Sequence, residues 1–253
     1  MQKPSKNEQL TPAEMITRQG FFVLFEVLSR DELKEARVLI DNSKKTKPSR
    51  HHLDATAHPA CQRHVLHRSP GLRALARCVR RRIAARTGLI PERARITRDL
   101  LFDKRPGDNW WVAPHQDRVI AFRRTFESPE ATAWSRKSGI PHALGSARLL
   151  ALILTVRLHL DDTDAGNGAL LVAPGSHRYG ILDPAGLAEL RPEHTIAVPA
   201  GAALLMSPRL VHASRCSADP RPRRILHLEL AAEPAPAPLE FHDALAPRDL
   251  VEA

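Results

Sequence analysis

The sequence predicts a mainly β fold with N-terminal helices, in which a double-stranded β-helix (jelly roll) forms the core. Helical patterns with recognisable caps are confined to about residues 11–90, whereas short apolar runs separated by Gly, Pro, Asp and Asn fill about residues 94–231. Such runs are typical of antiparallel strands in a sandwich or barrel. Helices first and strands later, in a chain of 253 residues, favour one domain over residues 1–253 that ends in an extended tail, residues 232–253.

Capping signals define the helices of the N-terminal part. Thr11 and Glu14 form a capping box around Pro12, and Ser29 forms a second one with Glu32. Glycines directly after the periodic stretches end the first and third helices. The predicted helices run from Thr11 to Gly20, from Ser29 to about Asn42 and from Ser69 to Thr87, and a strand over Phe21–Val27 separates the first two.

The apolar runs of the second part are the predicted strands. Between two of them, residues 122–146 show little periodicity, and a loop of that length in a compact domain is usually functional. We therefore expect this segment to form a lid that orders over bound substrate. The predicted strands are Ile96–Phe102, Trp111–Ala113, Leu149–Leu160, Ala169–Val172, Thr195–Val198, Ala202–Met206 and Arg223–Leu230.

Composition excludes several classes of protein. The three cysteines have no paired spacing, which argues against a disulfide framework and against a cysteine zinc site. The longest apolar run, Leu149–Val156, is far shorter than the roughly 20 residues of a membrane helix. Residues 1–10 are polar and lack the apolar stretch of a signal peptide. We therefore expect a cytoplasmic protein that does not bind a membrane.

The formal net charge of +10 could serve nucleic acid, an anionic substrate or solubility alone. The one short basic run, Arg80–Arg82, lies on a predicted helix, and no stripe of the sequence alternates basic and aromatic residues. Since single-stranded nucleic acid is bound on stacking aromatic side chains, we expect no nucleic-acid partner. The expected partner is a small-molecule substrate, and the sequence predicts no particular oligomeric state.

A possible iron-binding motif, His-x-Asp, occurs three times, at residues 52–54, 115–117 and 159–161. On a strand, this spacing points both side chains to the same face. With a second histidine from another strand, the motif can hold Fe(II) on one face and leave positions open for a co-substrate and O2. His52 lies in a polar loop and is expected to be exposed, whereas spacing alone leaves both His115 and His159 open.

A second histidine and a cationic anchor occur close together in the last part of the chain. His212 follows the run Ala202–Met206, and Arg223 comes 11 residues later, after a turn-like stretch. We expect a hairpin that brings Arg223 close to His212. If the co-substrate is 2-oxoglutarate, its far carboxylate needs such an Arg, which can bind it through two hydrogen bonds, and Ser214 could donate a hydroxyl to it.

Nine blocks of the chain, which together span about residues 11–230, match the pattern of one known family. They are Gly20–Leu24, Leu101–Lys104, Asn109-Trp110, Pro114–Asp117, Leu160–Asp162, Asn167–Arg178, Gly201–Leu205, His212–Ser214 and Arg223-Arg224. In these blocks the chain resembles the phytanoyl-CoA dioxygenase family of Fe(II)/2-oxoglutarate-dependent oxygenases. The Asn-Gly to Pro-Gly-Ser-His block and the closing His to Arg-Arg block are the most specific.

The resemblance implies two groups of site residues. The implied metal ligands are His115, Asp117 and His212. The implied 2-oxoglutarate contacts are Arg223, Ser214, Gln116, Lys104 and Asn109, although Lys104 and Asn109 could equally be a surface Lys and a turn Asn. We expect substrate contacts from Trp111, Arg118, Trp134, His142 and Arg157. His159 matches a different element of the family, and Arg224 does not match the anchor.

The activity implied by the resemblance is hydroxylation of a C–H bond, coupled to conversion of 2-oxoglutarate to succinate and CO2. Because Asp117 is present, no ligand position is vacated for a halide, which favours hydroxylation over halogenation. Desaturation or ring closure on the same iron, and a catalytically silent jelly-roll binding protein, are the alternatives. Pro114 and Leu158 replace residues that are often aromatic in the family, so the substrate is unassigned, and the basic residues of 122–146 favour an anionic one.

Overall fold

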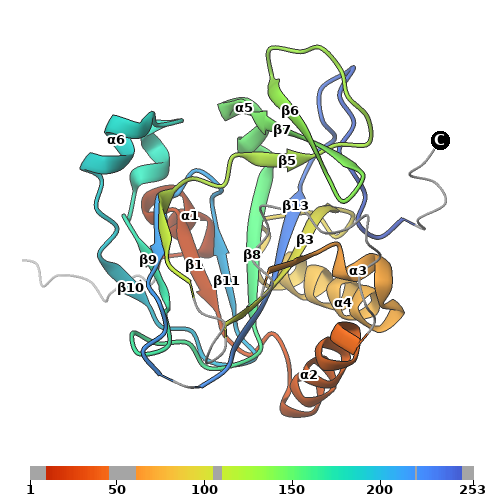
Figure 1. Cartoon of the computed structure of the whole chain (residues 1–253), viewed down its shortest axis with the longest axis vertical. Helices are drawn as coiled ribbons and strands as arrows, with labels where there is room; N and C mark the ends of the chain where they lie inside the picture. The colour runs from red at the N-terminus through yellow and green to blue at the C-terminus, as the bar shows by residue number, and fades with distance from the viewer. Residues whose placement is uncertain (1–9, 46–60, 105–109, 220, 247–253) are drawn as a thin grey trace, which may run out of the picture.

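The structure, a computed structural model, is built on three antiparallel sheets (Figure 1). It describes residues 10–45, 61–104, 110–219 and 221–246, so His52, Asn109 and the end of the tail lie outside the described residues. The largest sheet has the order β1 (Phe21–Leu24), β11 (Ala203–Met206), β8 (Ile153–His159), β13 (Arg223–Ala231), β3 (Arg95–Lys104) and β2 (Cys61–Arg63). The second consists of β10 (His194–Ile196), β9 (Leu170–Val172), β12 (His212–Ser214) and β4 (Val112–His115), and the third of β5 (Val119–Ala121), β7 (Ile140–Gly145) and β6 (Ala131–Lys137).

The two larger sheets face each other and enclose a common interior. Phe21 and Met206 of the six-stranded sheet pack with Leu170 and Val172 of the four-stranded sheet in one buried apolar cluster. Elsewhere the two sheets are joined by polar side chains, such as Lys104, that cross the interior. This arrangement confirms the predicted jelly roll.

The capping signals place the N-terminal helices as predicted. The helix α1 (Pro12–Gln19) has the Thr11–Glu14 capping box and ends at Gly20, whose φ of 87° favours glycine. The helix α2 (Arg30–Lys45) begins with the Ser29–Glu32 box and extends three residues beyond the predicted end. The helix α4 (Pro70–Thr87) is capped by Ser69. The shorter helices α3 (Val65–Arg68), α5 (Ala147–Ala151), α6 (Pro184–Glu189) and the 3-10 helix η2 (Ser176–Tyr179) are not predicted.

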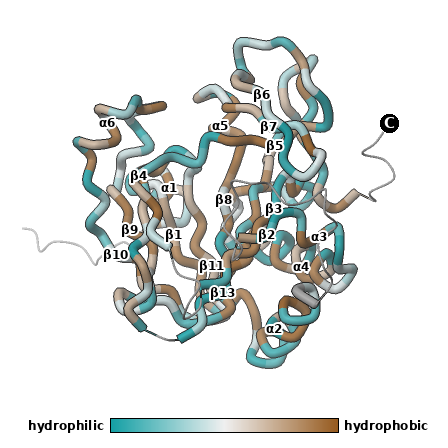
Figure 2. The backbone as a smooth tube through the Cα atoms, in the orientation of Figure 1, coloured by the Kyte–Doolittle hydropathy of each residue, from teal (hydrophilic) through white to brown (hydrophobic). Residues whose placement is uncertain are grey.

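The strand β13 has an apolar outer face and a largely polar inner face. Leu226 and Leu228 of β13 belong to the core cluster that also contains Ile40 of α2 and Leu72 of α4. Figure 1 shows α2, α3 and α4 gathered on one side of the six-stranded sheet. In Figure 2, hydrophilic and hydrophobic residues alternate along α2, as they do in a helix with one buried face. The alternate residues of β13, which include Arg223, therefore point into the jelly roll.

Residues 122–146 are not the irregular loop that the sequence suggested, and their expected role as a lid stays a prediction. Residues 122–146 contribute to an antiparallel sheet, in which β6 and β7 form a hairpin that turns at Ser138 and Gly139, with φ values of 54° and 85°. The hairpin rests on an apolar cluster, where the ring of Phe122 lies 5.1 Å from that of Trp134 and 5.8 Å from that of Phe241. Burial of these side chains makes the segment an ordered element with its own small core.

Two strand predictions also differ from the structure. The apolar run Leu149–Leu160 is not one strand, because Ser146 caps α5 before β8 begins. The expected hairpin between His212 and Arg223 does not form: β12 pairs with β4 and β9, whereas β13 pairs with β3 and β8 in the other sheet. The chain therefore crosses from one sheet to the other between these residues.

The described part of the tail is packed rather than simply extended, because Leu239, Phe241 and Ala244 are buried. Within the described ranges, no helix combines the length and the apolar character that crossing a membrane requires. The cytoplasmic location, the single-domain boundaries and the absence of a nucleic-acid partner stay predictions.

A buried ion pair on the inner face gives a prediction on stability. Arg98 of β3 contacts Glu229 of β13 at 2.7 Å, and both side chains are almost fully buried. Glu229→Ala should lower the free energy of unfolding by about 3–5 kcal/mol, because it leaves the guanidinium of Arg98 buried without its partner. Urea unfolding measures this, with Asp164→Ala as the control, since the Asp164–Arg221 pair is half exposed and should contribute about 0–1 kcal/mol. A loss below about 1 kcal/mol for Glu229→Ala would contradict the assignment.

Candidate metal and co-substrate site

Three predicted metal ligands meet where β4 lies beside β12. His115 at the end of β4 is directly opposite His212 at the start of β12, and their ring centroids are 4.2 Å apart. The Asp117 carboxylate lies 3.7 Å from Nε2 of His115 and 3.6 Å from Nε2 of His212. These separations are too long for direct hydrogen bonds, yet the three donor atoms all lie within 4.8 Å of one another. The arrangement leaves space for an ion between them.

The surrounding backbone orients both imidazoles. Nδ1 of His115 lies 2.8 Å from the carbonyl oxygen of Ala113, and Nδ1 of His212 lies 2.8 Å from that of Leu210. A carbonyl only accepts, so each Nδ1 carries the proton and each Nε2 presents a lone pair toward Asp117. Hydrogen bonds of this kind orient metal-ligating histidines in general.

The charge state of the cluster suits a divalent cation. Burial and the neighbouring His115 lower the pKa of His212 to about 3, so its imidazole is neutral. Burial alone would raise the pKa of Asp117, but the two histidines hold it well below its usual range. Oδ2 of Asp117 is buried and has no hydrogen-bond partner among the described residues. Burial lowers the pKa of His115, but its contact with Asp117 outweighs burial and raises that pKa above its usual value. A buried, unpartnered carboxylate oxygen beside two imidazoles fits a metal of the Fe(II) type, and two histidines with one carboxylate are the donor types of a facial site.

Three buried cations lie on the inner face of the neighbouring sheet. Lys104 of β3 and Arg223 of β13 are directly opposite each other, and Arg157 lies on the adjacent strand β8. Lys104 donates to Oγ of Ser214 and to the carbonyl of Arg215, both at 2.8 Å, and Arg223 donates to the carbonyl of Gly168. Among the described residues none of the three cations has a carboxylate within 4.0 Å.

Burial of these cations costs free energy that an anion would offset. Burial lowers the pKa of Arg223 to about 9, with the charge of Arg157 as a further cause. Burial lowers the pKa of Lys104 to about 7, followed by the charge of Arg223. Buried charges are normally paired, so three buried cations beside a metal site indicate a place for an anionic ligand.

The side-chain amide of Gln116 bonds to the backbone of neighbouring loops. Its Nε2 donates to the carbonyls of Gly180 and Arg209 at 2.8 and 2.7 Å, and its Oε1 accepts from the backbone N–H of Leu182 at 3.0 Å. Gln116 alternates with His115 and Asp117, so its side chain takes the opposite side of the strand end. The expected co-substrate contact of Gln116 stays a prediction, although its amide already holds the loops that flank the site.

The expected substrate residues are dispersed. Trp111 is 61% exposed, and Trp134 packs on Phe122 in the hairpin core. His142 is fully buried with its ring 6.0 Å from that of His64, in a histidine cluster separate from the metal ligands. Arg118 directly follows Asp117 and is half-buried, so of the five only Arg118 and Arg157 adjoin the site.

Three basic side chains of residues 122–146 have partners within the protein. Arg123 and Arg124 both pair with Glu240, at 3.2 and 2.9 Å, and Arg136 donates to the carbonyl of Gly139. These pairs weaken the argument that the segment favours an anionic substrate, which stays a prediction.

The third His-x-Asp motif is structural. His159 contacts the hydroxyl of Thr163 at 2.8 Å, and Asp161 pairs with Arg224 at 2.8 Å and with Arg37 at 3.4 Å. Arg224 thus points away from Arg223, as expected of neighbours on a strand. His177, which is not expected to be a ligand, lies 3.2 Å from the carbonyl of Thr17.

His227 is a site residue that the sequence interpretation missed. Its Nδ1 lies 3.3 Å from Arg157, its Nε2 lies 3.6 Å from Glu229, and its ring meets the edge of Phe102. The sequence could have identified His227, because this residue follows Arg223 by four positions on one strand and therefore lies on the same face.

Comparisons with known proteins agree with this geometry. The family model of phytanoyl-CoA dioxygenase matches residues 16–225. Among solved structures, the chain is similar to the non-heme alpha ketoglutarate dependent carbocyclase SnoK from nogalamycin biosynthesis (17% identity, 91% of this chain and 87% of that chain, TM-score 0.61). It is also similar to EctD from S. alaskensis (22%, 94% and 84%, 0.60) and to HygX from Streptomyces hygroscopicus with nickel and 2-oxoglutarate bound (14%, 88% and 87%, 0.59). These likenesses concern the fold, and a search of the curated proteins gives no match.

Proposed function

Because the chain belongs to the phytanoyl-CoA dioxygenase family of non-haem iron oxidoreductases, we propose that it hydroxylates a C–H bond of a small molecule with Fe(II), 2-oxoglutarate and O2. Succinate and CO2 are the other products. The observation that carries the proposal is the facial donor set of His115, Asp117 and His212, with three buried cations beside it. A catalytically silent binding protein has no need for both features.

The three ligands present the donor atoms that iron requires. The Nδ1 bonds of His115 and His212 fix the tautomer with a free Nε2, and Asp117 stays ionised. Bound iron supplies the activation of O2 together with 2-oxoglutarate. The protein positions the ligands: the two histidines come from paired strands whose register is set by the sheet, and Asp117 follows two residues after His115.

We assign Arg223 as the anchor of the far carboxylate of 2-oxoglutarate. Its side chain is buried on the inner face of β13, and the hydroxyl of Ser214, which accepts from Lys104, is free to donate its own hydrogen to the same carboxylate. Arg157 interacts electrostatically with both Asp117 and Arg223, so it adds positive charge between the metal and the anchor. Exclusion of water by this buried interior strengthens each of these interactions.

The proposal specifies the substrate only as a small molecule. Arg118, next to Asp117 in the chain, is the cation that supports an anionic group on the substrate, since Arg123 and Arg124 are paired with Glu240. Hydroxylation is preferred to desaturation or ring closure because it needs no further positioned group.

Succinate release tests the function. The purified chain, loaded anaerobically with Fe(II), is given 2-oxoglutarate and O2 with a panel of small metabolites, and the products are identified by mass spectrometry. We expect succinate release to rise with one class of metabolite, which gains one oxygen atom. A product that has lost two hydrogens indicates desaturation or ring closure, and metabolite binding without any succinate would contradict the enzyme proposal.

The pH dependence of co-substrate binding is a further prediction. Below about pH 7, Lys104 is an ammonium that attracts the carboxylate, whereas above that pH binding must take up a proton. The KM for 2-oxoglutarate should therefore rise by up to about tenfold per pH unit between about pH 7 and pH 9. Lys104→Met should have a higher KM at pH 6 and a flat profile. A wild-type profile as flat as that of Lys104→Met would contradict the role of Lys104.

A further inference from the structure

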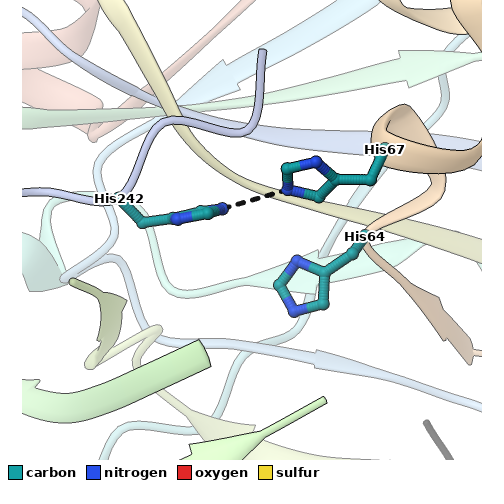
Figure 3. Close-up of side chains that lie close together, drawn as sticks. All are labelled: His64, His67 and His242. Carbon is teal, nitrogen blue, oxygen red and sulfur yellow. Dashed lines mark hydrogen bonds between the residues drawn. The ribbon is translucent and has the colours of Figure 1, made fainter. Parts of the chain in front are cut away.

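A second histidine cluster lies away from the candidate iron ligands. His64 is the residue before α3, His67 lies within α3, and His242 comes from the C-terminal segment that follows β13. Each offers a ring nitrogen, and these nitrogens all lie within 4.8 Å of one another. Figure 3 shows the three rings converging from two distant segments of the chain, with His67 and His242 meeting tip to tip.

Hydrogen bonds among the described residues do not account for the burial of His64. Both ring nitrogens of His64 are buried without a partner among the described residues, and the side chain is only 7% exposed. Buried polar atoms normally have a partner, so two on one ring point to a ligand that binds there. His64 also has a φ of 54°, a region that residues other than glycine seldom adopt.

The spacing of two of the nitrogens, which can share a hydrogen bond as they stand, also fits a metal site. Nε2 of His67 lies 3.2 Å from Nε2 of His242. A tetrahedral zinc ion, with Zn–N distances of about 2.0–2.1 Å, places two of its nitrogens about 3.3 Å apart. A small movement of His64 would bring its nitrogen into the same sphere, and water would take the fourth position.

Two of the three histidines are also in the chemical state that a metal needs. Burial lowers the pKa of His64 to about 2 and that of His242 to about 4, with neighbouring histidines as a further cause in each case. Their lone pairs are therefore available at neutral pH. The backbone N–H of Leu66 donates to Asp99, and that of His64 donates to the carbonyl of the same residue, which holds the start of α3 on β3.

We propose that His64, His67 and His242 form a second metal site, which binds Zn²⁺ and ties the C-terminal segment to α3. The site is structural: it joins two segments that pack near the β5–β7–β6 sheet, since the backbone N–H of His242 donates to the carbonyl of Ala121 at the end of β5. It is independent of the iron ligands and of the proposed reaction.

The test uses a full-length, untagged chain in which Asp117→Ala and His212→Ala have disabled the iron site. Zn²⁺ is titrated against a chromophoric chelator, and the melting temperature is followed with and without Zn²⁺. We expect one Zn²⁺ per chain and a rise in melting temperature of about 5–10 °C when zinc exceeds its Kd a hundredfold. His67→Gln and His242→Gln should each abolish the zinc-dependent rise, whereas His194→Gln, an exposed histidine, should leave it unchanged.

Two results would overturn the proposal. The first is that the parent chain with the disabled iron site binds no Zn²⁺ and melts at the same temperature with zinc as with a chelator. This result overturns the proposal without any further variant. The other is a zinc-dependent rise that persists in both glutamine variants. Far-UV circular dichroism shows whether each variant is folded, and a failure here leaves succinate release by the intact chain untouched.

Discussion

Asp117→Ala abolishes 2-oxoglutarate-dependent turnover, with a loss in kcat on the order of 10³-fold or more. The carboxylate is the one anionic donor of the cluster, and its buried Oδ2 has no other partner among the described residues. Two imidazoles alone lose both affinity for Fe(II) and the facial geometry. Iron content and succinate release per iron are the measurements. His115→Ala and His212→Ala should behave in the same way.

The matched control is a buried histidine from the competing motif. His159→Ala should leave iron binding intact, because His159 contacts Thr163 and lies outside the donor cluster. Loss of iron in His159→Ala, together with its retention in His115→Ala, would contradict the assignment of the ligands.

Arg223→Ala raises the KM for 2-oxoglutarate by roughly 30-fold to several thousand-fold, which corresponds to about 2–5 kcal/mol. The reason is that one side of a buried, charge-assisted pair is removed and the co-substrate carboxylate is left without its partner. Steady-state kinetics at fixed substrate, with iron content measured in parallel, separate this effect from loss of metal. Iron binding should persist.

Arg224→Ala provides the comparison. Its guanidinium pairs with Asp161 and Asp41 on the outside of the sheet, so its removal should lower stability and change the KM for 2-oxoglutarate little. Equal effects of the two substitutions on this KM would show that the assumed faces of β13 are wrong.

The sequence predicted best those elements whose ends depend on side chains only a few residues apart. The capping boxes at Thr11 and Ser29 define helix starts because the side chains that bind the free N–H groups are three residues apart. The hairpin of β6 and β7 carried such a signal in Ser138-Gly139, a dipeptide suited to a tight turn with two positive φ values. Both faces of β7 are buried, so apolar and polar residues do not alternate along it, and the periodicity of the sequence did not reveal this strand.

Long-range pairing could not be predicted from spacing. The 11 residues between His212 and Arg223 fit a hairpin, yet the chain crosses between sheets, and Arg223 reaches the site from the opposite wall. Spacing made both His115 and His159 candidates for the first ligand, and the family resemblance, not the spacing, selected His115, Asp117 and His212. The tertiary fold alone places Lys104 beside Ser214 and separates His142 from the iron site.

The central claim is that the donor cluster of His115, Asp117 and His212 holds iron beside an anion site built on Arg223. Its most direct test is an anaerobic titration of the Fe(II)-loaded chain with 2-oxoglutarate, followed by visible absorption, because the chelated 2-oxo acid gives a charge-transfer band that iron bound elsewhere does not. We predict that the band appears in the wild type at one equivalent, is absent in His115→Ala, and requires far more 2-oxoglutarate in Arg223→Ala. A band of wild-type strength in His115→Ala, or none in the wild type, would contradict the claim.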